Sequence, residues 1–500
     1  MAQVSPLFIY NGESFETANC PVFGWDDFHS TLVQNLYSGA RLSALFVRHD
    51  PEGPRLTAVL SLPEHSRIIV FSCRVGDAYP SLTLDCPQAH WFEREIAEKW
   101  SIIPEGHPWL KPIRFERTYS AQKIRACEIG VTDFFHMVGE EVHEVAVGPV
   151  HAGVIEPGHF RFQCHGETVY HLEISLGYQH RGIEQAIAGG PSSRTIHHME
   201  TLSGDSTIGH GTAYCRTVES LSGIQAPPRA QEIRAVAAEL ERIANHIGDL
   251  GALAGDVGFL PTLNYCGRIR GDVLNLTAEI CGNRFGRGLA VPGGVPFDLD
   301  PGRAENILKR LARIQKDAEE AVELMFGTPS VLARMEGVGT MPVETARDIG
   351  LVGVAARACG ISCDVRCEFP YEIYRFNLIP ECTWSSCDCF ARAYVRWLEV
   401  KQSIVFIFDQ LKSLSQGPVI IEPRPSMPPE RMTISLAEGW RGEICHVAGT
   451  DAQGRFSFYK IIDPSFHNWF GLACVLRGQQ ISDFPLCNKS FSLSYCGHDL

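Results

Sequence analysis

The chain has 500 residues, of which 45% are hydrophobic, 20% charged and 10% aromatic, and its formal net charge is −14. This composition is typical of a folded globular protein, and the acidic balance argues against a general nucleic-acid-binding function. The sequence contains no apolar stretch of about 18 residues that would predict a transmembrane helix, and its start has neither the basic nor the apolar region of a secretory signal.

Residues 1–115 are predicted to form a small α/β domain. Apolar or alternating runs predict strands at Ala44–Val47, Leu56–Leu62 and Arg67–Cys73. A charged segment, Trp91–Trp100, predicts a helix after these strands. Residues 116–141 are polar and mixed in character, and we interpret them as a connector.

Residues 142–500 are predicted to form a larger domain. Alternating residues at 160–164 and 169–174 predict a β-hairpin near its start. Apolar residues at three- and four-residue spacing predict long helices at Pro227–Leu253, Pro301–Met325 and Cys389–Leu414. Strand and turn residues return over Glu438–Leu500. The predicted fold class is therefore α+β, with a small α/β domain followed by a helical bundle and flanking small sheets.

The chain has 18 cysteines. Because a secretory signal is lacking, we interpret them as reduced and mostly buried thiols, with metal ligation as the alternative. The densest clusters are Cys359, Cys363 and Cys367, and Cys382, Cys387 and Cys389. Neither cluster matches a zinc-type CxxC pair or a ferredoxin run, which favours a structural role. The sequence also has no Walker loop and no nicotinamide-type glycine motif between a strand and a helix.

Several motifs together carry a resemblance to a known family. They are HAGVIEPGHF at 151–160, GYQHRGIE at 177–184, GHGTAYCRTVE at 209–219 and ELERIANHIGDLGA at 239–252. With them the chain resembles the large subunit of membrane-bound, energy-converting nickel–iron hydrogenases and the homologous quinone-site subunit of respiratory complex I. The segment at 91–110 is similar to the small companion subunit of complex I. The resemblance implies a fusion of the two, with a hydrogenase-large-subunit-like fold for residues 142–500.

The resemblance also locates the metal-ligand positions. The hydrogenases hold nickel and iron with two CxxC pairs, and counting along the chain puts these positions on Ser203 and Ser206 and on Ser465 and Asn468. Nickel and low-spin iron require soft, anionic thiolates, which hydroxyl and amide groups do not replace. We therefore expect a cavity that binds no metal. The aromatic side chains of Phe466 and Trp469 next to the lost ligands suggest that this cavity has become smaller.

The resemblance implies which other residues face this cavity. His151, Glu156 and His159 lie on the tip of the first hairpin, where groups that titrate near neutrality can pass protons or contact an acceptor. The alternative is that these histidines cap turns or bond to neighbouring backbone groups. Arg441 matches an arginine above the iron, and it can bind a substrate, pair with Glu443 or hold its loop. Asp463 is placed in the same cleft.

A second group of residues is expected to face a partner. In the family, the motif containing His180, Arg181 and Glu184 lies against the terminal 4Fe–4S cluster of a neighbouring subunit, where a fixed and a titratable charge tune its potential. The alternative is an ion network at a helix start that stabilises packing. His246 is expected to be a polar residue satisfied within the helix bundle.

The function that follows is a subunit of a complex-I-like or hydrogenase-related oxidoreductase. It would form the acceptor cleft beside an iron–sulfur small subunit, with antiporter-like membrane-arm subunits as further partners and no nucleic acid. The acceptor would be a quinone or another small molecule, and any nicotinamide would bind elsewhere in the complex. Its expected location is peripheral, on the cytoplasmic face of the inner (plasma) membrane. The alternatives are a non-catalytic scaffold and an active nickel–iron hydrogenase.

Overall fold

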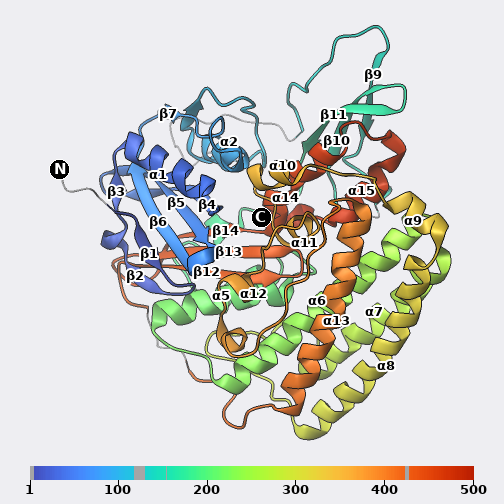
Figure 1. Cartoon of the computed structure of the whole chain (residues 1–500). Coiled ribbons are helices and arrows are strands. Elements are labelled where there is room, and N and C mark those ends of the chain that lie inside the picture. The colour runs from blue at the N-terminus through green and yellow to red at the C-terminus, as the bar shows by residue number, and fades with distance from the viewer. Residues whose placement is uncertain (1–4, 117–129, 154, 423–426) are drawn as a thin grey trace.

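The computed structural model describes residues 5–116, 130–153, 155–422 and 427–500. Its N-terminal unit is built on a five-stranded sheet (Figure 1). The strand order is β1 (Leu7–Ile9), β6 (Arg67–Arg74), β5 (Gly53–Leu62) and β4 (Arg41–Asp50), with β3 (Val22–Phe23) also paired to β6. Helix α1 (Trp25–Tyr37) packs against β6 and α2 (His90–Trp100) against β4. The three predicted strands and the predicted helix are confirmed, whereas α1 was not predicted.

A second, four-stranded sheet lies at the centre of the molecule (Figure 1). Its order is β14 (Phe456–Ile462), β13 (Gly442–Thr450), β12 (Arg431–Gly439) and β2 (Ser14–Glu16). Every residue of β13 is buried, because α5 (Thr207–Ser222) packs against the sheet. Strand β2 comes from the N-terminal unit, whereas β12, β13 and β14 come from the last third of the chain. One sheet therefore joins the two parts of the chain.

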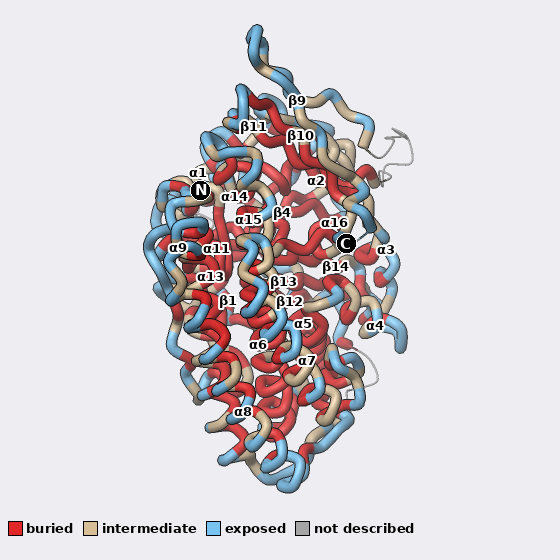
Figure 2. Tube along the Cα trace, turned by 90° about the vertical axis from the view of Figure 1, so that its right-hand side faces the viewer, coloured by how far each residue is buried: buried red, intermediate tan, exposed pale blue. Residues whose placement is uncertain are grey.

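The helical bundle is centred on α6 (Pro228–Asp256), which lies between α7 (Leu260–Cys281) and α13 (Cys389–Lys412). Helix α8 (Pro301–Phe326) packs on the outer side against α7 and α13. Three of these four helices are predicted from the sequence, and α7 is not. Figure 2 shows that buried residues run continuously from this bundle through the central sheet into the upper part of the molecule.

The bundle core contains charged side chains as well as apolar ones. Arg242 of α6 donates to Glu399 of α13 at 3.3 Å, and Arg357 pairs with both Glu399 (2.8 Å) and Glu438 (2.9 Å). His246 lies 2.8 Å from Glu399 and is fully buried, in agreement with its predicted place in the bundle. Such pairs are tolerated in a protein interior because each charge has a partner at hydrogen-bonding distance.

A three-stranded sheet projects from the top of the molecule in Figure 1. Its order is β11 (Thr168–Ser175), β10 (His159–His165) and β9 (Val142–Val147), which confirms the predicted hairpin. The shorter elements are β7 (Ala78–Pro80), β8 (Ile103–Glu105), α3 (Ile183–Ala186), α4 (Thr195–Met199), α9 (Pro329–Met335), α10 (Val343–Asp348), α11 (Gly353–Arg357) and α12 (Val365–Glu368).

The C-terminal prediction is correct only in part. The sequence predicts strands and turns over Glu438–Leu500, and β13 and β14 agree. Beyond them the chain forms α14 (Pro464–Val475), α15 (Phe484–Phe491) and α16 (Tyr495–Asp499). Helix α14 is buried on almost every side, so it lacks the polar face whose periodicity reveals a helix in a sequence.

The cysteines also differ from expectation at one point. Cys359 and Cys387 form a disulfide across 28 residues of sequence, where reduced thiols were predicted. Cys363, Cys382 and Cys389 are free and buried, as expected for structural thiols. Within the described ranges, no helix is both long and apolar enough to span a bilayer.

Candidate functional site

A cavity of about 860 Å³ lies where the β9–β10 connection meets α6, α15 and the turn between β12 and β13. This volume is in the range of small-molecule sites in proteins. The charged, amide and imidazole side chains around it are His151, Glu156, Asp205, Asn245, Asp249, Asp256, Arg270, Arg441, Asn488 and Lys489, and Ser482, Ser492 and Tyr495 add hydroxyls. The fold therefore brings together three residues that the sequence placed in the cleft, namely His151, Glu156 and Arg441.

The ion pair between Arg441 and Asp205 forms one wall of this cavity. Nη1 and Nη2 of Arg441 donate to the two carboxylate oxygens of Asp205 at 2.6 and 2.8 Å, which is the bidentate geometry of strong charge-assisted pairs. Nε donates to the carbonyl of Ser492, and the guanidinium lies 3.9 Å from the ring centroid of Trp440. Of the alternatives considered for Arg441, a pair with Glu443 is not observed, because Glu443 pairs with Arg41 at 2.6 Å.

The four expected ligand positions do not all meet. Ser203 and Ser206 each lie 3.3 Å from Nη1 of Arg441. The hydroxyl that lies opposite Ser203 belongs to Ser494, with the two Oγ atoms 3.0 Å apart. The count along the sequence assigns this place to Ser465 or Asn468.

The two residues assigned by that count lie further away. Ser465 accepts a hydrogen bond from the backbone N–H of Ser494 at 2.8 Å. The side-chain amide of Asn468 is bonded to the backbone of Val352, at 3.0 and 3.1 Å. Ser494 and Gly497 have the same spacing as Ser203 and Ser206, and a Cβ at Gly497 would lie 2.7 Å from the carboxyl of Asp463.

These donors do not fit a nickel–iron centre. The hydroxyls of Ser203 and Ser206 are neutral, weakly acidic oxygen ligands that stand where such a centre requires anionic thiolates, and both already lie within hydrogen-bonding distance of the Arg441 guanidinium. Burial alone would lower the pKa of Arg441, but the Asp205 carboxylate raises it above its usual value, so this charge is fixed. Among the described residues, no group of three or more His, Cys, Asp or Glu side chains is arranged to hold a metal.

The predicted hairpin residues have different roles. Nε2 of His151 donates to the carbonyl of Gly158 at 2.9 Å. Glu156 accepts from the backbone N–H of Tyr495 at 3.2 Å, which ties the hairpin to the C-terminal segment. His159 does not line the cavity, because its Nδ1 donates to the carbonyl of Gly148 at 3.3 Å. For His159 the expected alternative, bonding to a nearby backbone group, describes the observed contact.

Asp463 lies behind the cavity, at the end of a buried polar chain. Its Oδ2 is 2.9 Å from Nε2 of His210, whose Nδ1 is 3.2 Å from Nε2 of His446. Nδ1 of His446 is in turn 2.9 Å from the hydroxyl of Tyr459. All four side chains are at most 4% exposed. We call this set, Asp463, His210, His446 and Tyr459, the buried relay.

The buried relay has two self-consistent hydrogen-bond patterns. When His210 is neutral, its Nε2–H donates to Asp463, His446 donates to His210, and Tyr459 donates to His446. When His210 carries a second proton, donor and acceptor exchange in the last two bonds. His210 then donates to His446, and His446 donates to Tyr459. Burial alone would raise the pKa of Asp463, but its hydrogen bond to His210 and the nearby Arg441 charge hold that pKa below the usual range.

Tyr459 connects the relay to the second predicted group of residues. It lines a smaller cavity of about 180 Å³ together with Lys99, Glu184 and Lys460. Glu184 is ion-paired to Lys99 at 2.6 Å and to Lys460 at 3.1 Å, and it is 8% exposed. Burial alone would raise the pKa of Glu184, but these two lysines hold it well below its usual value. Glu184 therefore matches the expected alternative of an ion network.

His180 and Arg181 lie closer to the surface. Nδ1 of His180 donates to the carbonyl of Asp499 at 2.7 Å, and Nε2 is 3.4 Å from Glu116. Burial alone would lower the pKa of His180, but the hydrogen bonds to Glu116 and Asp499 raise it. Arg181 is exposed and donates to the carbonyls of Thr201 and Leu202. These two residues are the part of the motif available to a partner.

The two aromatic residues next to the lost ligands do not fill the cavity. Trp469 is fully buried and packs against Tyr495 with ring centroids 4.8 Å apart. Phe466 packs against Phe92 of α2 at 5.0 Å. Neither residue lines the cavity, so the prediction that they reduce it is wrong. Sequence reasoning also missed Asp205, His446 and Tyr459, which only tertiary folding brings to the site.

Comparisons with known proteins agree with this arrangement. Residues 256–436 match the family described as the respiratory-chain NADH dehydrogenase 49 Kd subunit, and residues 24–123 match the 30 Kd subunit of the same enzyme. The chain is 30% identical to formate hydrogenlyase subunit 5 of Escherichia coli, over 83% of this chain and 76% of that protein.

Two further relatives extend the comparison. The carbon monoxide-induced hydrogenase of Rhodospirillum rubrum is 30% identical over 70% of this chain and 96% of its own length. An NADH-quinone oxidoreductase subunit of Bdellovibrio bacteriovorus is 26% identical over 82% of this chain and 80% of that protein. The similarity therefore spans both regions of the chain, and it includes proteins named for hydrogenase and for quinone oxidoreductase activity.

Proposed function

Because the chain belongs to the family of complex I 49 Kd-type subunits and their hydrogenase relatives, with a 30 Kd-type region ahead, we propose that it is the acceptor-cleft subunit of an energy-converting oxidoreductase. In this proposal the complex couples electron transfer to ion translocation without a nickel–iron centre. The observation that carries it is the Arg441–Asp205 pair, which lies against Ser203 and Ser206 beside an 860 Å³ cavity.

The cavity suits a small organic acceptor better than a metal. Arg441 and Lys489 bring positive charge to the lining, and Phe162, Phe484 and Tyr495 bring apolar or aromatic surface. A carbonyl placed near such positive charge is easier to reduce, because the charge stabilises the negative charge that develops on the carbonyl oxygen. A quinone, or another small molecule that takes up two electrons and two protons, has the required chemistry.

Protons and electrons would reach the cavity from different sides. In this proposal the buried relay, which ends at Asp463 behind the cavity, supplies protons to the cleft from the direction of Tyr459. Electrons would come from a 4Fe–4S cluster of a partner subunit docked near His180 and Arg181. This chain would then bind and orient the acceptor and move protons, and the cluster would supply the electrons.

The remaining partners are proposed by the same reasoning. Antiporter-like membrane subunits would complete the complex and hold this chain as a peripheral subunit on the cytoplasmic face of the inner (plasma) membrane. The domain division proposed from sequence, with boundaries at 115 and 141, has support from the separate family matches at 24–123 and 256–436. Strand β2 nevertheless pairs with β12, so the proposed N-terminal domain shares a sheet with the larger one.

The proposal is tested on the purified native complex. Its iron–sulfur clusters are reduced with dithionite, excess reductant is removed, and reoxidation by 2,3-dimethyl-1,4-naphthoquinone is followed by absorbance. The wild-type complex is expected to be reoxidised, and His151→Gln to be slowed about tenfold, because the amide can still donate to the Gly158 carbonyl but cannot take up and pass on a proton. His143→Gln, at an exposed position of β9, is the matched control. Reoxidation at equal rates in wild type and both variants would favour a non-catalytic scaffold.

A further inference from the structure

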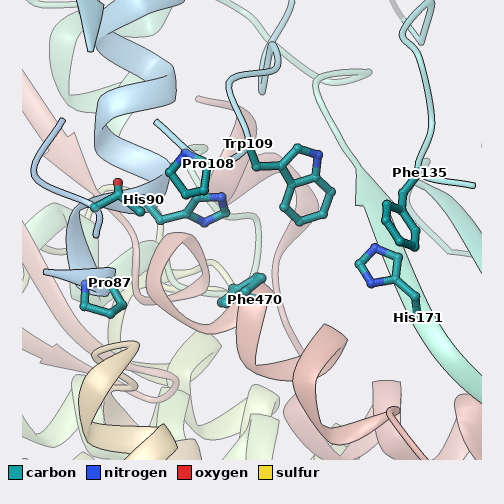
Figure 3. A pocket seen from close by; sticks show the side chains of 8 residues that line it. Pro87, His90, Pro108, Trp109, Phe135, His171 and Phe470 are labelled. Carbon is teal, nitrogen blue, oxygen red and sulfur yellow. The ribbon is translucent and has the colours of Figure 1, made fainter. Parts of the chain in front are cut away.

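A second cavity, remote from the acceptor cleft, has its own chemical character. Its volume is about 410 Å³, and it lies where the N-terminal unit, the segment before β9, β11 and α14 meet. The residues around it are Thr83, Pro87, His90, Pro108, Trp109, Phe135, His171 and Phe470. Figure 3 shows the rings of these residues around a shared space, with His90 and Pro108 on one side and Phe135 and His171 on the other. We call it the aromatic pocket.

The rings of the aromatic pocket form a nearly continuous lining. The ring centroids of His90 and Phe470 are 5.0 Å apart, and those of His90 and Trp109 are 5.9 Å apart and nearly parallel, at 25°. On the opposite side His171 lies 4.5 Å from Phe135 and 5.7 Å from Trp109. Aromatic faces prefer offset-stacked or edge-to-face neighbours, so this lining fits a flat ring better than a branched chain.

Two nitrogen atoms of the pocket lack hydrogen-bond partners. Nδ1 of His90 and Nε2 of His171 are buried, and neither atom has a hydrogen-bond partner among the described residues. His107, which stacks on His90, is different, because its Nε2 donates to the His90 carbonyl and its Nδ1 accepts from the Trp109 N–H. Buried polar groups in proteins are nearly always paired, so two orphaned nitrogens in one pocket indicate a missing partner.

The pocket is also uncharged. Its lining contains no Lys, Arg, Asp or Glu. Burial lowers the pKa of both His90 and His171, so both rings are neutral near pH 7. Of the nearby cations, Arg94 donates to the carbonyls of Lys111 and Pro112, and Lys111 pairs with Glu173 at 2.8 Å. Arg477, whose charge also acts on His171, is exposed to solvent and does not line the pocket. A neutral imidazole offers one donor and one acceptor, which suits an uncharged hydroxyl or carbonyl.

From these observations we propose that the aromatic pocket binds a small, uncharged, planar aromatic molecule with a hydroxyl or carbonyl oxygen at its edge. The ring stacks between the walls formed by His90 with Phe470 and by His171 with Phe135. The edge oxygen pairs with an imidazole nitrogen that otherwise has no partner. A mostly apolar lining with a few convergent polar atoms is the usual form of such sites. This inference does not depend on the function proposed for the acceptor cleft.

The test uses calorimetry with three probes on the full chain and on the purified complex. The probes are 2-naphthol, naphthalene, which lacks the hydroxyl, and 2-naphthoate, which is charged. We expect saturable binding of one 2-naphthol, about tenfold tighter than either of the others, as one well-placed hydrogen bond allows. No saturable binding of 2-naphthol, or tighter binding of 2-naphthoate, would overturn the proposal.

Variants locate the site. His171→Phe keeps a ring but removes both nitrogens, so it should weaken 2-naphthol about tenfold and leave naphthalene unchanged. Phe135→Ala removes an exposed wall and should weaken both probes. His165→Phe, at an exposed position of the same hairpin, should change neither. Binding that survives both pocket variants would contradict the proposal, and binding to the chain but not to the complex would assign the pocket to a partner's side chain.

Discussion

Ser203 and Ser206 each differ from cysteine by one atom, and this atom decides whether the side chain can ligate a soft metal. Thiolates stabilise soft metal cations, whereas hydroxyls are suited to hydrogen bonds. In this chain both hydroxyls lie 3.3 Å from the guanidinium of Arg441, whose charge is balanced by Asp205. The two hydroxyls, the guanidinium and the carboxylate therefore form one hydrogen-bonded arrangement.

Replacing Arg441 tests how much this arrangement stabilises the fold. Arg441→Gln removes the bidentate pair and the Arg441 donors to Ser206 and to the Ser492 carbonyl, whereas Asp205 keeps its hydrogen bond from Ser203. Because Arg441 is buried but the Asp205 side chain is 34% exposed, the loss should cost about 1–3 kcal/mol and the urea midpoint should fall clearly. Arg455→Gln is the control, because Arg455 forms an exposed i,i+4 pair with Asp451 and should cost at most about 0.5 kcal/mol. Equal midpoints for the two variants would show that the Arg441 pair contributes little.

The buried relay makes a prediction about rate. Tyr459→Phe removes only the hydroxyl that is 2.9 Å from His446, so the fold should be retained. If protons pass along the relay, reoxidation of the reduced complex should slow by at least about tenfold, and its pH dependence should change. Tyr170→Phe, which alters an exposed tyrosine of β11, is the control. An unchanged rate and pH profile for Tyr459→Phe would exclude the relay as the proton source.

Glu241 makes a prediction about pH. Its carboxylate accepts from the N–H groups of Ile208 and Gly209 at the start of α5, yet burial raises its pKa to about 8. Between about pH 4.5, where the unfolded side chain ionises, and pH 8, the folded protein binds the extra proton, so stability falls as pH rises. Glu241→Gln should therefore raise the melting temperature more at pH 8 than at pH 5. A gain that is the same at both pH values would contradict this assignment.

At the scale of elements, the pairing of β2 with β12 joins the N-terminal unit to the rest of the chain. Asn11, just before β2, makes this junction through its side chain. Its Nδ2 donates to the carbonyls of Phe369 (2.9 Å) and Leu436 (3.0 Å), and its Oδ1 accepts from the Leu436 N–H at 2.8 Å. One side chain thus satisfies backbone groups of two distant segments.

Asn11→Ala should weaken this junction. Backbone groups of Phe369 and Leu436 would lose a buried partner, and each such loss costs about 1–3 kcal/mol, so the melting temperature should fall by several degrees. Asn264→Ala is the control, because its side chain bonds only to the Leu260 carbonyl within its own exposed helical turn. Its effect should stay within about 0.5 kcal/mol. A melting temperature of Asn11→Ala equal to that of Asn264→Ala would contradict a structural role for the β2–β12 junction.

The elements also show what a sequence reveals. Strands β4, β5 and β6 of the N-terminal sheet are predicted because their apolar runs are short and bounded, whereas the short strands β1 and β3 are not. The amphipathic helices α6, α8 and α13 are predicted because one face of each is buried and the other is polar. Helix α7 is missed, since its segment contains a proline and two glycines. The Cys359–Cys387 disulfide leaves no local signal, because its partners are 28 residues apart.

The site follows the same division. His151, Glu156 and Arg441 belong to recognisable motifs, and the structure brings them to one cavity. Ser494, His446 and Tyr459 carry no motif of their own and come from the residue before α16 and from two strands of the central sheet. Ser494 contacts Ser203 and His446 contacts His210, each across more than 200 residues of sequence. Such contacts follow from the fold and cannot be predicted from spacing along the chain.

At the scale of the whole molecule, polar groups link the acceptor cleft to the N-terminal unit. Glu184 and Lys460 belong to the larger region, whereas Lys99 and Glu95 belong to α2. Lys460 pairs with Glu95 and, at 3.1 Å, with Glu184, and Tyr459 beside it begins the buried relay. The two family regions are therefore connected by buried ion pairs next to the relay, which explains why a fused arrangement suits this chain.

The proposed function depends on a cleft that holds no nickel–iron centre. The most direct test is the nickel and iron content of the purified native complex per copy of this chain, measured with a hydrogen-uptake assay on the same sample. We predict no nickel, no hydrogen uptake and iron in the amount that partner iron–sulfur clusters require. One nickel per chain, together with hydrogen uptake, would contradict the roles given to Ser203, Ser206, Ser494 and Arg441 and would identify an active hydrogenase.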